Sequence, residues 1–221
     1  MPIRLDERLT AVAELAAGAK VLCDVGCDHG KLACYAVQTG RAESALATDI
    51  SAPSLRKAAE LAEDTGVYDR VETRLGDGLD PVADGEADTV VIAGMGGDLI
   101  ARILERAHAQ GKTFPRLVLS PNTHPERVRA TLAGTGYALT ADMRVPCAGK
   151  AYTVIAAERG DETLGELQLL FGKFFATDEA FRAEAGREAE ELGRTLAAHP
   201  EAAGLKEKKA LLERALKECG I

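Results

Sequence analysis

The sequence VLCDVGCDHGKL, residues 21–32, contains the features that decide the fold. It begins as an apolar run that ends at Asp24, continues through Gly26 and Gly30, and passes into a helical pattern at Leu32. This order predicts a strand, a tight loop and a helix. The glycines let the backbone approach a ligand closely, and the helix N-terminus offers free N–H donors. The stretch therefore predicts a nucleotide-binding sheet.

The position of Asp24 narrows the choice of ligand. The stretch lacks the dinucleotide-binding fingerprint G-x-G-x-x-G. A carboxylate two residues before the first glycine would repel a diphosphate and attract a cationic ligand. S-adenosylmethionine carries an ammonium and a sulfonium, so the sequence favours this methyl donor. A NAD-dependent dehydrogenase is the alternative from another class, and Asp24 without the fingerprint argues against it.

The chain alternates strand and helix patterns up to residue 160. We expect helices over residues 4–17, 31–39, 51–65, 98–109 and 125–133, and strands over 20–25, 44–48, 71–75, 88–93, 116–119, 137–145 and 151–157. Such alternation predicts a mostly parallel, doubly wound α/β sheet. The last two strands have no helix between them and should pair antiparallel. This combination predicts a Rossmann-like class I methyltransferase sheet.

The pattern changes beyond residue 160. Apolar residues recur at helical spacing from Phe181 to Leu196 and from Leu205 to Cys219, with His199-Pro200 between the two runs. We expect a helical hairpin that resembles a coiled coil, preceded by a short helix near residues 164–175. The chain should therefore have two domains, a methyltransferase domain over 1–160 and a C-terminal helical domain over 161–221.

Composition limits the location and the partners. The net charge is −8 and only 4% of the 221 residues are aromatic, so a nucleic-acid partner would need a local basic patch. No apolar run is long enough to predict a membrane span, and the N-terminal residues lack the apolar core of a signal peptide. Five cysteines without a framework spacing predict reduced thiols and a cytoplasmic location. The spacing of Cys23, Cys27, His29 and Cys34 is wrong for zinc, so we expect no metal.

Acids and glycines follow four of the predicted strands. Ligands of doubly wound sheets bind over the carboxyl ends of the strands, where these residues would gather. Asp49 could accept hydrogen bonds from both ribose hydroxyls of an adenosyl group, and Asp77 could accept one from its adenine amino group. Each residue alone could be a simple cap or turn, but four strand ends together favour a ligand site. We expect the donor site to contain Asp24, Gly26, Cys27, His29, Asp49, Ile50, Asp77, Gly78, Ala93, Gly94, Met95 and Gly96.

Several motifs occur together along the whole chain. They are LDERLTAV (5–12), DVGCDHGKL (24–32), GDGL (76–79), IAGMGG (92–97), LSPN (119–122), GKAY (149–152) and FGKF (171–174). With them the chain resembles the bacterial tRNA (adenine(22)-N(1))-methyltransferase family. The resemblance implies a class I methyltransferase domain, S-adenosylmethionine as methyl donor and tRNA as substrate, with transfer to N1 of an adenine.

Adenine N1 has a lone pair, so methyl transfer to it needs alignment and charge stabilisation rather than a base. We expect Asp28 to stabilise the adenine cation and Asn122 to bind the edge of the base. Substrate contacts are expected from Arg8, Arg102, Lys150 and Tyr152. We expect a monomer that binds no membrane.

Two further alternatives stay open. A methyltransferase acting on a protein or a small molecule fits the negative charge better but the helical tail worse. A non-catalytic RNA-binding protein could keep the same fold.

Overall fold

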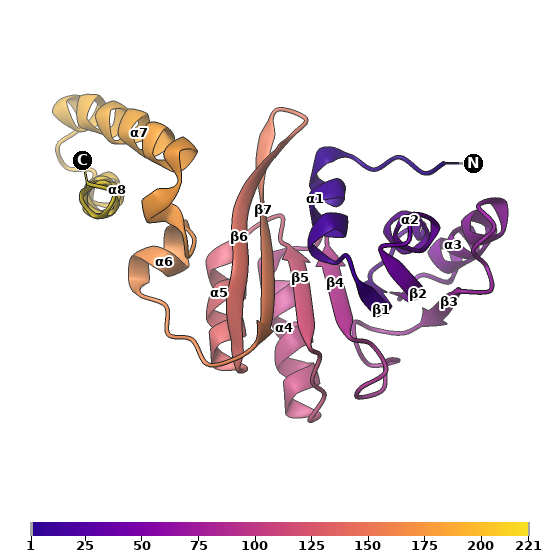
Figure 1. Cartoon of the computed structure of the whole chain (residues 1–221). Helices are drawn as coiled ribbons and strands as arrows, with labels where there is room; N and C mark the ends of the chain where they lie inside the picture. Colours follow the sequence, from indigo (N-terminus) through magenta and orange to yellow (C-terminus); the bar gives the residue numbers. More distant parts are fainter. Residues whose placement is uncertain (1, 221) are drawn as a thin grey trace. The chain divides into compact units, whose positions relative to one another are not determined.

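The computed structural model describes residues 2–220 and contains a seven-stranded sheet (Figure 1). The strands are β1 (Ala19–Val25), β2 (Ala42–Asp49), β3 (Val71–Leu75), β4 (Thr89–Ala93), β5 (Arg116–Ser120), β6 (Tyr137–Cys147) and β7 (Lys150–Arg159). Their order is β3-β2-β1-β4-β5-β7-β6. The first five strands are parallel, and β7 is antiparallel to both β5 and β6. The predicted fold class is confirmed.

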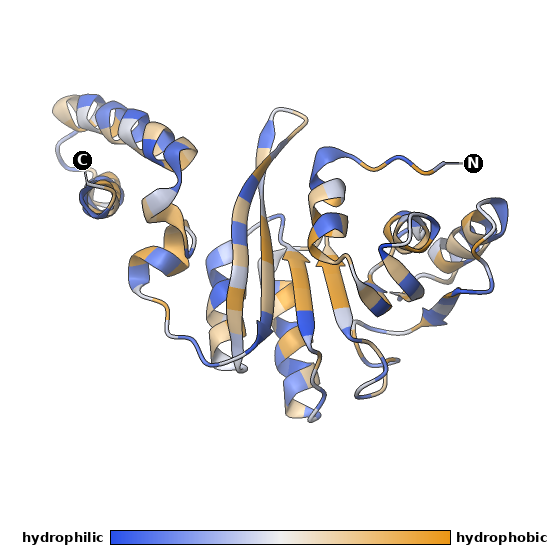
Figure 2. Cartoon of the chain, in the orientation of Figure 1, coloured by the Kyte–Doolittle hydropathy of each residue, from blue (hydrophilic) through white to orange (hydrophobic). Residues whose placement is uncertain are grey.

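Five helices belong to the sheet unit. They are α1 (Glu7–Leu15), α2 (Lys31–Gln38), α3 (Ala52–Asp64), α4 (Gly97–Ala109) and α5 (Pro125–Gly134). The α1 helix begins later than the sequence pattern predicts because Asp6 caps it, accepting the Leu9 N–H at 2.7 Å. Helices α1, α2 and α3 share one core cluster, whereas α4 and α5 lie behind the sheet in Figure 1. Central strands β4 and β5 are hydrophobic in Figure 2, as expected of strands covered on both faces.

The β6–β7 hairpin extends past the end of β5. Strand β5 pairs with β7 only from Arg116↔Glu158 to Leu119↔Ile155, whereas the β6–β7 pairing continues to Cys147↔Lys150. A two-residue turn joins the strands, and both of its residues have positive φ, 50° at Ala148 and 76° at Gly149. This is the backbone of a tight hairpin turn that matches the strand twist. The hairpin end carries Lys150 and Tyr152 beyond the edge of the parallel sheet.

A second compact unit begins at Leu164, after the first unit ends at Thr163. It contains α6 (Glu166–Phe171), a short 3-10 helix η1 (Phe175–Thr177), α7 (Glu179–Ala198) and α8 (Ala203–Glu218). Phe171, Phe175 and Phe181 form its aromatic core, with ring centroids 5.2–6.1 Å apart. In Figure 1 α8 is seen end-on and α7 from the side, so these helices cross instead of running side by side as in a coiled coil. None of the helices in residues 2–220 has the length and apolarity to span a membrane.

Candidate active site

A pocket of about 310 Å³ lies at the carboxyl ends of β1 and β4. We call it the β1–β4 pocket. Its lining is Arg8, Leu9, Asp24, Gly26, Cys27, Asp28, His29, Lys31, Leu32, Ala93, Gly94 and Met95. The structure thus brings together most of the residues predicted from the first and fourth strands. The predicted site residues did not include Leu9, Lys31 and Leu32, because a helical pattern gives no sign of which side chains face a ligand.

Asp24 is the most perturbed acid of this pocket. The residue is only 5% exposed, and burial raises its pKa from 3.8 to about 7. The Ala33 N–H donates a hydrogen bond that opposes this rise, while the negative charges of Asp49 and Asp28 add to it. A cationic group in the pocket would stabilise the ionised carboxylate. The site therefore fits an ammonium group.

Glycines in the loops after β1 and β4 leave space that the side chain of another residue would fill. Gly26 has φ +68°, and a Cβ there would lie 2.0 Å from the Met95 Cε. Gly94 has φ +83°, which side-chain-bearing residues adopt rarely. Burial, together with the negative charges of Asp24 and Asp49, raises the pKa of the nearby Cys27 thiol. This thiol is therefore neutral and unsuited to nucleophilic catalysis.

Asp49 lies at the end of β2 and anchors the neighbouring loops. One carboxylate oxygen accepts the Asp28 N–H at 3.2 Å and the other accepts the Ser51 N–H at 2.8 Å. Each oxygen keeps acceptor capacity for a ribose hydroxyl. Ile50 is 74% exposed and Leu75 is 61% exposed, and Leu75 is the register partner of Asp49. These exposed apolar side chains suit the faces of an adenine ring, and Leu75 is a candidate that the sequence pattern did not reveal.

Asp77 is hydrogen-bonded to Arg106, a residue of α4. Arg106 donates from Nη1 to the Asp77 carboxylate at 2.8 Å and from Nη2 to its carbonyl oxygen at 2.9 Å. This hydrogen bond lowers the pKa of Asp77, and the charge of the exposed Arg102 lowers it further. Next to it, Gly78 has φ +60° and accepts from the Thr48 hydroxyl at 3.2 Å. An adenine amino group would share Asp77 with Arg106.

Some predicted residues lie outside the pocket linings. They are Asp49, Ile50, Asp77, Gly78, Gly96 and Arg102. Gly96 is the N-cap of α4, and a Cβ on it would lie 3.2 Å from the Thr123 hydroxyl.

A second pocket, of about 460 Å³, lies between the end of β5 and the β6–β7 hairpin. We call it the β5–β7 pocket. Its lining is Pro121, Asn122, Pro125, Lys150, Ala151, Tyr152 and Thr153. The three residues predicted separately to touch the substrate, Asn122, Lys150 and Tyr152, therefore meet in one place.

The two pockets adjoin each other. Asn122 donates from Nδ2 to the Gly94 carbonyl at 2.6 Å and from its backbone N–H to the Met95 carbonyl at 2.8 Å. Arg8 lines the β1–β4 pocket, and its guanidinium lies 5.1 Å from the ring centroid of Tyr152 in the other pocket. One ligand can therefore meet another at this shared wall.

Asp28 lies at the rim of the β1–β4 pocket. It has φ 52°, a conformation that Asp tolerates better than most residues, and its side chain is 80% exposed. Its Oδ1 lies 3.4 Å from Nε2 of His29, which in turn lies 3.2 Å from Nζ of Lys57. The carboxylate is therefore exposed to a ligand at the rim of the β1–β4 pocket.

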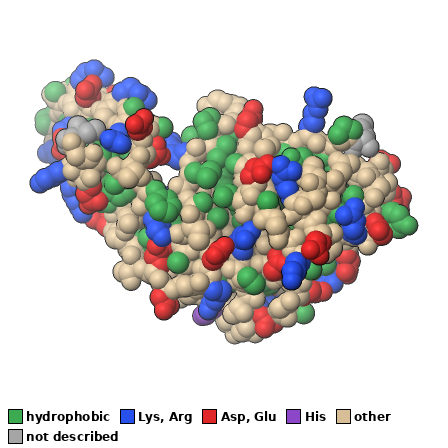
Figure 3. Space-filling view, viewed as in Figure 1, with side chains coloured by type: hydrophobic (Ala, Val, Ile, Leu, Met, Phe, Trp, Pro, Cys, Tyr) green, Lys and Arg blue, Asp and Glu red, His purple; other side chains and the backbone are tan. Residues whose placement is uncertain are grey.

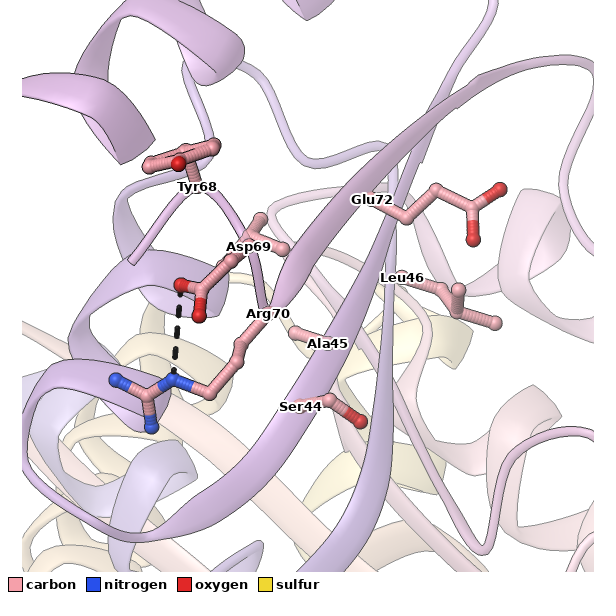
Figure 4. Close-up of a pocket in the computed structure, with 8 residues that line it drawn as sticks. Ser44, Ala45, Leu46, Tyr68, Asp69, Arg70 and Glu72 are labelled. Carbon is pink, nitrogen blue, oxygen red and sulfur yellow. Dashed lines mark ion pairs between the residues drawn. The ribbon is translucent and has the colours of Figure 1, made fainter. Parts of the chain in front are cut away.

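Other surfaces give weaker candidates. A pocket of about 450 Å³ on β2 and β3, shown in Figure 4, is lined by residues 44–46 and 68–72. Its Arg70 and Asp69 pair with each other at 4.0 Å, and it contains none of the predicted site residues. In the part of the chain that the structure describes, no three His, Cys, Asp or Glu side chains are grouped to hold a metal ion.

Comparisons with known proteins identify the family of the chain. The family model for a methyltransferase domain matches residues 5–155. A tRNA (adenine(22)-N(1))-methyltransferase of Bacillus subtilis is 40% identical over 159 residues, which cover 72% of this chain and 67% of the relative. The chain belongs to this methyltransferase family. The family resemblance predicted from the motifs is confirmed.

Solved structures match the methyltransferase over nearly its whole length. Streptococcus pneumoniae Sp1610 in complex with S-adenosyl-L-methionine is 30% identical, with a TM-score of 0.85 and coverage of 96% of this chain and 100% of that one. The Bacillus subtilis M1A22 tRNA methyltransferase TrmK is 33% identical, with a TM-score of 0.79 and coverage of 99% and 98%. The likeness includes both compact units of the methyltransferase.

Proposed function

We propose that this methyltransferase transfers a methyl group from S-adenosylmethionine to N1 of adenine 22 in tRNA. The observation that carries the proposal is the pair of adjoining pockets, one fitted to a cationic nucleoside and one lined by an aromatic ring and an amide. The 40% identical relative carries the name of this activity. A cofactor and a target base bound in these pockets would meet at the wall formed by Gly94 and Asn122.

The chemistry of the residues present fits the donor. Asp24 would hold the ammonium group, and Asp49 the ribose hydroxyls. Ile50 and Leu75 would cover the adenine ring, with Asp77 at its edge. The other residues predicted for the donor site lie in glycine-rich loops. Their backbone would form the walls of that site. When bound, S-adenosylmethionine supplies a methyl group whose bond to sulfur breaks, leaving the electron pair on sulfur, as adenine N1 uses its lone pair to form the new N–C bond.

Residues of the β5–β7 pocket would hold the base. Asn122 uses Nδ2 for Gly94, so its Oδ1 remains an acceptor for the exocyclic amino group of adenine. Tyr152 offers a ring on which a flipped base can stack. Asp28 would lie near the base and stabilise the positive charge that develops on it. Methylation at N1 needs no proton removal before attack. The role of these residues is therefore to align the base and to stabilise the positive charge that develops on it.

Contacts with the tRNA body are proposed for both units. Lys150 at the rim of the β5–β7 pocket and Arg102 on α4 would contact phosphates. The second unit would hold a more distant part of the tRNA. There Lys208 pairs with Glu188 and Lys209 with Glu213, so part of its basic charge is already neutralised. Figure 3 shows acidic and basic side chains interspersed over the visible face of the first unit. We therefore expect modest tRNA affinity that falls with salt.

We further propose that the two units act as separate domains, divided near residue 160, in a cytoplasmic monomer. Both pockets are built from one chain, so no second copy is needed to complete them. The cysteines at positions 23, 27, 34, 147 and 219 are all free thiols, which suits a reducing compartment.

The test is methyl transfer from labelled S-adenosylmethionine to a bulk tRNA pool, with mass spectrometry of the nucleosides. A gain of 1-methyladenosine, mapped to position 22, is the expected result. Transfer to protein or small molecules but not to tRNA would favour the alternative acceptors. Donor binding and tRNA binding without any transfer would favour the non-catalytic protein.

The role of Asp28 is tested in the same assay. Asp28→Ala and Asp28→Asn should both slow transfer and leave tRNA binding unchanged, because either change removes the negative charge. Full transfer rate in both variants would overturn the role given to Asp28.

A further inference from the structure

The two outer strands of the sheet, β6 and β3, differ in how they are protected against pairing with another chain. On β6, Glu162 accepts the Leu139 N–H at 2.7 Å. The pairing of β6 with β7 is irregular between Leu139 and Ala141, and Pro146 has no N–H to offer. Proteins use such features to prevent an outer strand from pairing with another chain. Strand β3, in contrast, keeps a regular register with β2 and contains no proline.

Strand β3 leaves one side of its backbone unpaired. Its hydrogen bonds to β2 begin at the Arg70 carbonyl, which accepts at 2.8 Å, and end at the Gly76 N–H, which donates at 3.0 Å. Because backbone groups alternate between the two sides of a strand, those of Val71, Thr73 and Leu75 point away from β2. These N–H and C=O groups have no hydrogen-bond partner among residues 2–220. We call this row of groups the β3 edge.

The amino end of the β3 edge is acidic. The end of α3, the loop after it and the start of β3 contain one base, Arg70, and the acids Glu60, Glu63, Asp64, Asp69 and Glu72, all of them exposed. Asp69 and Arg70 lie 4.0 Å apart, which is the long limit of an ion pair and is marked by the dashed line in Figure 4. An excess of exposed acids attracts Lys and Arg side chains and repels phosphate groups.

The pocket shown in Figure 4 lies at this same end and has room for a basic side chain. Its volume is about 450 Å³, and its lining includes Tyr68, Asp69 and Glu72. Tyr68 is 68% exposed, so a cation can reach the face of its ring. Glu72 pairs with Arg74 at 2.6 Å, but its side chain is 58% exposed and can accept from a second cation.

We propose that the β3 edge binds an extended, basic segment of a partner protein as an additional strand. Hydrogen bonds to the backbone of Val71, Thr73 and Leu75 would hold the segment, and a Lys or Arg side chain would enter the pocket beside Tyr68. A nucleic acid fits poorly, because its phosphates would meet the acids and its backbone lacks alternating N–H and C=O groups. Strands β2, β1 and β4 separate the β3 edge from β5, so the β5–β7 pocket stays open when the partner is bound.

The first test measures the affinity of labelled synthetic peptides for the full chain by fluorescence anisotropy at low salt. The probe is an eight-residue peptide of alternating lysine and valine. The matched control peptide has a methyl group on every backbone nitrogen, which keeps the charges but leaves no N–H. The probe should bind at least about tenfold more tightly, because the control cannot form the strand hydrogen bonds. Equal affinities would overturn the proposal, and so would equal binding of a peptide of alternating glutamate and valine.

The second test locates the peptide on the protein. In amide hydrogen exchange followed by NMR, the N–H groups of Val71, Thr73 and Leu75 should exchange at least about fivefold more slowly with saturating probe. Unchanged exchange at these three residues would overturn the proposal. Thr73→Pro removes one N–H of the β3 edge and no hydrogen bond to β2, so it should weaken the probe about tenfold. Thr73→Val keeps the N–H and should bind as the natural chain does. A Thr73→Pro chain that unfolds at the natural urea concentration and binds the probe fully would contradict the assignment.

The third test concerns the charge of the partner. Glu63→Gln combined with Asp69→Asn should weaken the probe about threefold to tenfold at low salt, and less at high salt. The control combines Glu201→Gln with Glu207→Gln, two exposed acids of the second unit, and should bind the probe as the natural chain does. Unchanged affinity in the first double variant would rule out a basic partner.

Discussion

Replacing Asp24 with asparagine should stabilise the ligand-free first unit and weaken donor binding. The folded carboxyl has a pKa of about 7, against an ordinary value of 3.8. A difference of roughly three pKa units corresponds to about 4 kcal/mol at pH 8. The free energy of unfolding is lower by this amount because the folded protein buries the charge. Asparagine removes the charge but adds N–H groups that need acceptors. We therefore expect Asp24→Asn to raise the free energy of unfolding by about 2–4 kcal/mol.

The sign of the pH dependence follows from proton binding. Between about pH 4 and pH 7 the folded protein keeps a proton on Asp24, whereas the unfolded chain does not. The stability of the natural protein relative to Asp24→Asn should therefore fall by about 1.4 kcal/mol per pH unit as the pH rises through this window. Above pH 7 the difference should level off, because both the folded and the unfolded carboxyl are then ionised.

The assay is urea unfolding followed by tyrosine fluorescence between pH 5 and pH 8. All four tyrosines, Tyr35, Tyr68, Tyr137 and Tyr152, lie before residue 163, so the signal reports the first unit alone. Asp64→Asn, at the exposed end of α3, is the charge-matched control and should show no such pH trend.

A difference between Asp24→Asn and the natural chain that stays constant from pH 5 to pH 8 would refute the burial argument. S-adenosylhomocysteine should bind Asp24→Asn at least about tenfold more weakly in calorimetry, because the charge that faces its ammonium is gone.

Three further predictions concern other contacts. Gly97→Ala places a Cβ 2.3 Å from a backbone oxygen in the segment after β5, so the rate of methyl transfer should fall about a hundredfold. Gly134→Ala is the control, because its Cβ meets open space and the rate should not change. Arg129→Met removes the cation that pairs with the buried Asp142 carboxylate at 2.8 Å, and it should cost about 3–5 kcal/mol in the tyrosine-detected unfolding; a loss below 1 kcal/mol would contradict this. Phe181→Ala should melt the second unit and weaken tRNA binding without moving the tyrosine transition, and unchanged tRNA affinity would argue against a contact there.

The sequence was sufficient for the order of strands and helices in the first unit. Strand and helix patterns are local, and the acid–glycine loop after β1 has a geometry set by its own residues. Asp24, Gly26 and Gly94 therefore lie in one pocket as their strand ends predict. The start of α1 differs from the hydrophobic pattern because one side chain, Asp6, decides where the helix begins.

Partners set by the tertiary structure could not be predicted from spacing. Asp77 is bonded to Arg106, 29 residues later, and no local signal connects them. Leu75 is a single exposed apolar residue at a strand end, which a hydrophobic pattern cannot distinguish from a buried one. Arg8 depends on a rotamer that only the fold determines, since its guanidinium meets Tyr152, 144 positions away. The crossing of α7 and α8 depends on their packing, whereas the repeat alone suggested a coiled coil.

The insertion of β7 between β5 and β6 sets the order in which the first unit can be completed during synthesis. Until Arg159 has left the ribosome, β5 is the open edge of the sheet, with the apolar run Leu117–Leu119 unpaired on that side. The strand that covers this edge, β7, is synthesised only after β6 and the turn at Ala148-Gly149. A nascent chain that pauses between residues 120 and 150 therefore exposes an unpaired strand edge, with which a strand of another protein chain can pair. The hairpin closes that edge and, in the same step, delivers Tyr152 to the pocket.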